Sequence, residues 1–137
     1  MSGARILLVE DEAILAMDLQ DKLTDLGYRV LATTSSGEAA VRMAAELNPD
    51  LVLMDIRLNG IMDGIEAGRQ IGSLLQIPIV FMSAYSDEAT MNRARSAQPY
   101  DYLIKPFGPE KLNSTIVTAL RSASSKKLKD APKKFPE

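Results

Sequence analysis

Five short apolar runs alternate with segments of helical periodicity along the chain, and this alternation limits the possible folds more than any other feature. Each run has the length of a β-strand, and the runs occupy residues 6–9, 28–33, 51–54, 78–82 and 100–104. The runs at 6–9, 51–54 and 78–82 are continuous, and such runs are typical of parallel strands that are buried on both faces. Strands that alternate with helices predict an α/β domain in which helices cover both faces of one parallel sheet.

Helix signals lie between the runs. Gly27 ends the first expected helix, and Ser35 and Glu38 have the spacing of a capping box for a second helix over residues 39–47. A third is expected over 64–75, and a fourth, over 87–97, has so few large apolar residues that we expect it to be the least firmly packed. Pro109 suits the first turn of the last helix, which is expected to end at Arg121. The residues expected on the apolar sides are Ile14, Leu15, Leu19, Leu23 and Leu26 in the first helix, Ile65, Ile71, Leu74 and Leu75 in the third, and Leu112, Ile116, Val117 and Leu120 in the last.

Few topologies join five strands by right-handed crossovers. For a unit this small we expect a flavodoxin-like, three-layer, doubly wound (βα)5 fold, with a parallel five-stranded sheet in the order 2-1-3-4-5. The 137 residues are enough for one domain, which we expect over residues 4–121. Residues 122–137 are expected to form a flexible, lysine-rich tail or linker.

The composition excludes several classes of function. Without cysteine or histidine, the chain has no disulfide, no thiolate or imidazole metal ligand and no Ser-His or Cys-His nucleophile pair. The tail from Ser124 carries +3 and the body −5 of the net charge of −2, and an acidic body offers no basic face to nucleic acid. No apolar run is long enough to cross a membrane and no signal peptide is visible, so we expect a cytoplasmic location and no membrane partner.

Polar residues follow four of the five expected strands. Glu10 and Asp11 follow the first strand, Asp55 the third, Ser83 the fourth and Lys105 the fifth. In an open α/β sheet, ligands bind beyond the carboxyl ends of the strands, so these side chains are expected to converge at one edge. The alternative for each residue is structural: an aspartate after a strand often caps a loop, acids often begin a helix, and Ser83 and Lys105 could simply face water.

Three neighbouring carboxylates would repel one another unless a cation lay between them. Oxygen ligands favour Mg²⁺, Mn²⁺ or Ca²⁺ over zinc or copper. Lys105 could pair with Asp55 at rest and with a bound anion later. A carboxylate held by a metal and a lysine is a competent nucleophile toward phosphorus, Ser83 supplies a hydroxyl for a phosphoryl oxygen, and Ala84 leaves space for the group.

A set of five ordered motifs gives the chain its resemblance to a known family. The motifs are Val9-Glu10-Asp11-Glu12, Leu51-Val52-Leu53-Met54-Asp55, Met62-Asp63-Gly64, Phe81-Met82-Ser83-Ala84 and Tyr102-Leu103-Ile104-Lys105-Pro106-Phe107. Together they resemble the receiver domain of two-component response regulators, over roughly residues 4–121. The resemblance implies a phosphoacceptor signalling domain rather than an enzyme, with a sensor histidine kinase or a histidine phosphotransfer protein as phosphodonor.

The resemblance also implies a role for each acidic residue. Asp55 would be the phosphoacceptor, and Glu10, Asp11 and Asp55 would hold Mg²⁺, or Mn²⁺, together with the backbone carbonyl of Arg57. Asp11 would bind the metal directly and Glu10 through water.

Further roles fall on the residues after the fourth and fifth strands. Ser83, Ala84 and Lys105 would contact the phosphoryl group, and the bond between Lys105 and Pro106 would be cis. Tyr102 would be the switch aromatic that turns inward as Ser83 moves toward the phosphate. The face made of the fourth helix, fifth strand and fifth helix would then change, and it is also a candidate homodimer surface.

One loop departs from the commonest family pattern. The segment from Asp55 to Gly64 is one residue longer than usual and carries Asn59-Gly60 where a proline is frequent. Arg57 and Tyr85 flank the site at positions that, in this family, tune dephosphorylation.

Two other functions stay open at this stage. One is an aspartyl-phosphate phosphatase, although Arg57 stands where such enzymes commonly carry a second acid. The other is an interaction domain that works without phosphorylation. The sequence does not identify the downstream partner, nor decide between a protein that acts alone and a receiver from a longer chain.

Overall fold

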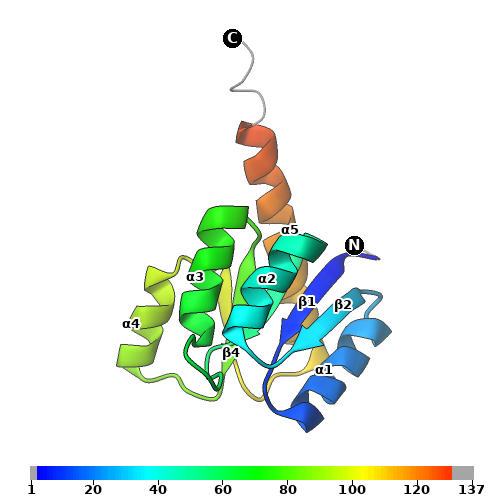
Figure 1. Cartoon of the computed structure of the whole chain (residues 1–137). Helices are drawn as coiled ribbons and strands as arrows, with labels where there is room; N and C mark the ends of the chain where they lie inside the picture. The colour runs from blue at the N-terminus through cyan, green and yellow to red at the C-terminus, as the bar shows by residue number, and fades with distance from the viewer. Residues whose placement is uncertain (1–2, 131–137) are drawn as a thin grey trace.

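The protein folds as a five-stranded parallel sheet between two layers of helices (Figure 1). The computed structural model describes residues 3–130. Sheet order is β2-β1-β3-β4-β5, as the sequence predicts. In chain order the elements are β1 (Arg5–Val9), α1 (Ala13–Asp25), β2 (Arg29–Thr34), α2 (Gly37–Leu47), β3 (Leu51–Asp55), α3 (Gly64–Leu75), β4 (Ile79–Ser83), α4 (Glu88–Ser96), β5 (Asp101–Ile104) and α5 (Pro109–Asp130).

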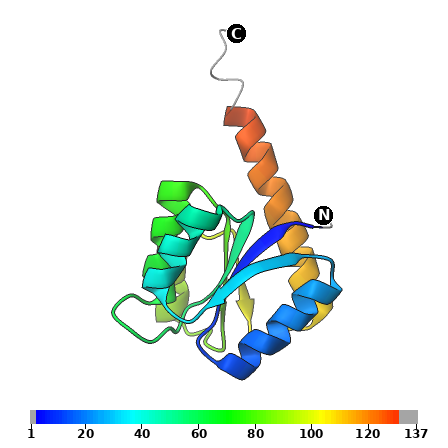
Figure 2. The same ribbon diagram turned by 45° about the vertical axis from the view of Figure 1, so that its right-hand side comes forward.

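Two apolar clusters, one on each face of the sheet, form the core. Successive residues of a strand point to opposite faces, so Val52 and Met54 join one cluster while Leu51 and Leu53 join the other. The first cluster lies under α2, α3 and α4, and the second lies under α1 and α5. Figure 2 shows α1 and α5 together on the side of the sheet opposite α2 and α3. The central strands β3 and β4 are therefore buried along their whole length.

Two residues expected in the core are exposed. Ile14 of α1 is 83% exposed and Leu74 of α3 is 74% exposed. On α1 the buried line runs through Leu19 and Leu23. Ile14 lies five positions before Leu19, and because a helix has 3.6 residues per turn, residues five positions apart do not lie on the same face. On α3, Leu75 continues the line of Ile71 four residues later, which leaves Leu74 to one side.

Two expected helix boundaries are wrong. The N-cap of α2 is Ser36, whose side chain accepts a hydrogen bond from the backbone N–H of Ala39, so Ser35 does not form the expected capping box. Helix α5 does not end at Arg121 but continues to Asp130, and Figure 1 shows it projecting beyond the body of the domain. Residues 131–137 of the expected tail lie outside the described residues, and the domain boundary at 121 stays a prediction.

Candidate functional site

The register of the sheet brings the strand ends together. Val9 pairs with Met54, and Asp55 pairs with Met82, so Glu10 and Asp55 follow on neighbouring strands at the same level. Across the next pair of strands, the backbone N–H of Lys105 donates to the carbonyl of Ser83 at 2.8 Å. The carboxyl ends of β1, β3, β4 and β5 thus form one edge, which carries Glu10, Asp11, Asp55, Ser83 and Lys105.

An acidic cluster with one lysine occupies this edge. Carboxylate oxygens of Glu10, Asp11 and Asp55 lie within 4.8 Å of one another. Glu10 and Asp55 are buried, and Asp11 is half-buried. The Nζ atom of Lys105 lies 2.7 Å from Oε1 of Glu10 and 3.1 Å from Oδ2 of Asp55. The ammonium group therefore compensates part of the negative charge of the two buried acids.

Burial and mutual repulsion shift the pKa values in this cluster. Burial raises the pKa of Glu10 above its ordinary value, the neighbouring Asp55 raises it further, and the hydrogen bond from Lys105 opposes both. For Lys105 burial alone would lower the pKa, but the bonds to Glu10 and Asp55 outweigh it, and the pKa rises. The raised pKa keeps Lys105 protonated beside the two acids, whereas burial disfavours the charged form of Glu10.

Backbone groups fix the position of Asp55. Its Oδ1 atom accepts a hydrogen bond from the N–H of Arg57 at 3.0 Å. The N-terminus of α3 lies so close to the end of β3 that a Cβ at Gly64 would lie 1.9 Å from the carbonyl oxygen of Asp55. The N–H of Gly64 in turn donates to the carbonyl of Ile56 at 2.9 Å. Helix α3 thus packs directly against the backbone that carries Asp55.

A second group of contacts lies after β4. The hydroxyl of Ser83 accepts a hydrogen bond from the N–H of Tyr85 at 3.1 Å, and the hydroxyl of Tyr102 donates to the carbonyl of Tyr85. The guanidinium of Arg57 lies 3.9 Å from the centre of the Tyr85 ring, which is cation–π geometry. Tyr102 is half-buried, and burial raises the pKa of its phenol. Tyr85 therefore joins Ser83, Tyr102 and Arg57.

A cleft of about 940 Å³ opens onto the acidic cluster. Asp11, Asp55, Ser83, Ala84 and Lys105 all line it, so the phosphoryl-contacting residues expected from the sequence share one cavity. Glu10 is not among the lining residues, because its side chain is fully buried. The peptide bond between Lys105 and Pro106, which also lines the cleft, is cis.

The donor set at this edge fits a hard divalent cation. Three carboxylates with oxygens this close offer only oxygen ligands, which Mg²⁺ and Mn²⁺ prefer. The N–H of Arg57 bonds to Asp55, and its carbonyl as a further metal ligand stays a prediction.

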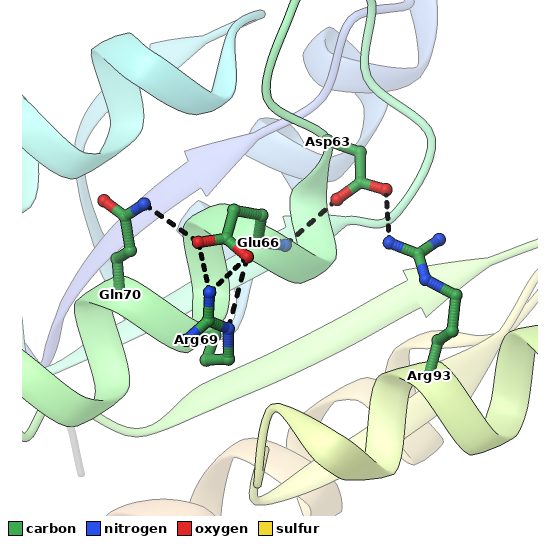
Figure 3. Close-up of polar contacts among 5 residues, drawn as sticks. All are labelled: Asp63, Glu66, Arg69, Gln70 and Arg93. Carbon is green, nitrogen blue, oxygen red and sulfur yellow. Dashed lines mark hydrogen bonds and ion pairs between the residues drawn. The ribbon is translucent and has the colours of Figure 1, made fainter.

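An ion pair in the cleft joins two residues to which sequence reasoning gave no role in the site. Arg93 of α4 lines the cleft and forms an ion pair with Asp63 of the β3–α3 loop at 2.9 Å (Figure 3). Asp63 had a signal, because it belongs to the motif Met62-Asp63-Gly64. Arg93 had none, since an arginine on a polar helix is most simply a solvent-facing residue.

Comparison with known proteins assigns the family. The family model described as "Response regulator receiver domain" matches residues 6–117. The chain belongs to this family. Its receiver domains are signalling domains that work by phosphorylation, and they imply a histidine kinase or a phosphotransfer protein as partner.

Relatives and solved structures agree with this assignment. The transcriptional regulatory protein PdtaR of Mycobacterium tuberculosis is 39% identical over 116 residues, which are 85% of this chain and 56% of PdtaR. The chemotaxis protein CheY of Thermotoga maritima is 37% identical over 123 residues, which are 89% of this chain and 98% of CheY. The solved signal receiver domain of a modulated diguanylate cyclase from Desulfovibrio desulfuricans G20 has a TM-score of 0.87 at 35% identity and covers 91% of this chain and 99% of that chain.

The relatives differ in length. This chain spans about half the length of PdtaR but nearly all of CheY.

Within residues 3–130 no helix is both long and apolar enough to cross a bilayer.

Proposed function

We propose that Asp55 accepts a phosphoryl group from the histidine of a sensor kinase or phosphotransfer protein in a Mg²⁺-dependent reaction. The observation that supports this most strongly is the position of Lys105, whose ammonium lies between Glu10 and Asp55 at 2.7 and 3.1 Å. An arrangement that only capped loops would not gather the oxygens of three acids around one lysine at a single edge of the sheet.

Each carboxylate has a role in this proposal. Asp11, Asp55 and the carbonyl of Arg57 hold the metal, and Glu10 completes the acidic pocket behind them. Bound Mg²⁺, or Mn²⁺, supplies positive charge that neutralises the oxygens of the transferring group. Lys105 holds Asp55 in place before the reaction through the hydrogen bond between Nζ and Oδ2.

The transfer exchanges one bond to phosphorus for another. A carboxylate oxygen of Asp55 attacks the phosphorus, the bond between phosphorus and the donor's imidazole nitrogen breaks, and its electron pair stays on that nitrogen. The product is an acyl phosphate on Asp55 and a free histidine on the donor. Lys105 and the hydroxyl of Ser83 then bind phosphoryl oxygens, and Ala84 leaves room for them.

The contacts of Tyr85 support a switch role for Ser83 and Tyr102. The hydroxyl of Ser83 is held by the N–H of Tyr85, and the carbonyl of Tyr85 is held by the hydroxyl of Tyr102. A turn of Ser83 toward the phosphoryl group breaks the first bond and frees the segment that the second bond holds. The α4-β5-α5 face then changes, and its exposed Tyr100 and Ile104 make it the candidate surface for a homodimer or a downstream protein.

Labelling with acetyl phosphate and Mg²⁺ tests the acceptor. Intact-mass measurement should show one phosphoryl group on the wild-type chain and none on Asp55→Asn, which keeps the size of the side chain but removes the nucleophile. EDTA should abolish labelling of the wild type. Undiminished labelling of Asp55→Asn would disprove the assignment, and steady turnover of a phosphate ester would instead support the phosphatase.

A further inference from the structure

The β3–α3 loop joins the phosphoacceptor to α4. It follows Asp55, the last residue of β3, whose Oδ1 accepts a hydrogen bond from the N–H of Arg57, and it ends at Asp63, the N-cap of α3. Figure 3 shows Asp63 between two partners: its Oδ1 accepts from the N–H of Glu66 at 3.0 Å, and its Oδ2 lies 2.9 Å from the guanidinium of Arg93. One carboxylate thus fixes the start of α3 and contacts α4.

Helix α4 has little else to hold it. Of its residues only Ala94 is buried. Among the described residues, the contact between Arg93 and Asp63 is the only side-chain hydrogen bond or ion pair that joins α4 to a segment beyond its own N-cap. The other side-chain hydrogen bonds of α4 lie within the helix or go to its N-cap Asp87. Elements with few buried contacts are the ones that move first.

The strength of this ion pair suits a contact that opens and closes. The side chain of Arg93 is 60% exposed and that of Asp63 is 33% exposed, and ion pairs this exposed contribute little free energy. The pair can hold a loosely packed helix without fixing it permanently. Phosphorylation of Asp55 changes the oxygen that bonds to Arg57 and places a new multiply charged anion in the cleft that Arg93 also lines.

We propose that the ion pair between Asp63 and Arg93 is a latch, closed while Asp55 is unphosphorylated and open once it is phosphorylated. Arg93 is then a positioning residue that sets how readily the switch turns on. The latch rests on the proposed function, because it requires that Asp55 be the acceptor. A ligand shifts a two-state equilibrium only by its differential affinity, so loss of the latch should make the active state easier to reach.

Titration of the full chain with beryllofluoride and Mg²⁺ tests the latch, with the amide signals of α4 followed by two-dimensional NMR. Arg93→Gln should lower the midpoint about two- to five-fold, the range for the loss of an exposed ion pair. Asp63→Asn should do the same, because asparagine keeps the cap of α3 while losing the charge. The double variant should shift the midpoint no further than the larger single effect, since both substitutions remove the same contact.

Two control variants separate the latch from general effects on charge or folding. Arg95→Gln removes an exposed arginine of the same helix whose side-chain hydrogen bond is to Asn92 within α4, and its midpoint should equal that of the wild type. Arg93→Lys keeps the charge and should restore most of the wild-type midpoint. If Arg93 had only a structural role, Arg93→Gln and Arg93→Lys would both lower the stability of α4, whether or not the charge is kept.

The outcomes distinguish the two proposals. If the wild type does not respond to beryllofluoride, or Asp55→Asn responds equally, the proposed function fails and the latch fails with it. If the wild type responds and Asp55→Asn does not, an unchanged or raised midpoint for Arg93→Gln overturns the latch alone. Additive effects of Asp63→Asn and Arg93→Gln would also overturn it.

Discussion

Helix α3 contains three glycines whose surroundings differ in a graded way, and their replacement by alanine tests how the site is built. A Cβ at Gly64 would lie 1.9 Å from the carbonyl oxygen of Asp55 and 2.8 Å from the Cα of Ile56. At Gly68 it would lie 2.6 Å from the ring of Phe81, and at Gly72 its nearest neighbour would be Ile79 at 3.8 Å. The first contact is with backbone, the second with a buried ring and the third is ordinary.

We expect Gly64→Ala to lower the free energy of unfolding by about 3 kcal/mol or more. The helix and the end of β3 must separate by about 1 Å, because real Cβ contacts essentially never fall below 3.0 Å, and neither partner has a rotamer that relieves the clash. Gly68→Ala should cost roughly 1–3 kcal/mol, since Phe81 is fully buried and cannot turn away. Gly72→Ala should stabilise by about 0.5–1 kcal/mol, the difference between alanine and glycine inside a helix.

Urea unfolding followed by far-ultraviolet circular dichroism, in EDTA, measures all three variants on one scale. From most to least stable, the order should be Gly72→Ala, wild type, Gly68→Ala and Gly64→Ala. A change of 1 kcal/mol in the free energy of unfolding corresponds to roughly 4 °C in melting temperature. A Gly64→Ala variant within about 0.5 kcal/mol of the wild type would refute the close packing of α3 on Asp55. A gain in stability at Gly64 similar to the gain at Gly72 would show that helix propensity, and not the approach to β3, decides the outcome.

Two further predictions concern the acidic cluster. Mg²⁺ at ten times its dissociation constant should raise the free energy of unfolding by about 1.4 kcal/mol, and Asp11→Asn should abolish this gain; a wild-type melting temperature that does not respond to Mg²⁺ would contradict the metal site. Because the pKa of Glu10 is raised in the folded state, the folded chain holds its proton longer than the unfolded chain, and stability falls as pH rises from about 4.5 through the raised value. Metal-free Glu10→Gln should therefore gain stability relative to the wild type across that window, as measured by urea unfolding, whereas a constant difference between the two chains would show that Glu10 does not titrate there.

Much of the fold follows from local pattern. The five strand-like runs and the helices between them lead directly to the observed sheet order, because parallel strands with short helical connections admit few arrangements. The errors are of a local kind. Ser35 and Ser36 are neighbouring serines that suit an N-cap equally well, and the backbone conformation of Ser36 decides between them. Ile14 and Leu74 are apolar residues whose exposure depends on how each helix turns over the sheet.

Part of the site is likewise predictable from the sequence, and the rest depends on the tertiary structure. The sequence by itself places two acids, a third acid, a serine and a lysine after four strands, and a parallel sheet has only one edge where its strands' carboxyl ends meet. Only the tertiary structure decides that Lys105 lies between Glu10 and Asp55, that Gly64 lies against the carbonyl of Asp55, and that Arg93 reaches Asp63. These contacts depend on strand register and on the distance between helices. Register and helix spacing are set by packing over the whole core, which no short stretch of sequence contains.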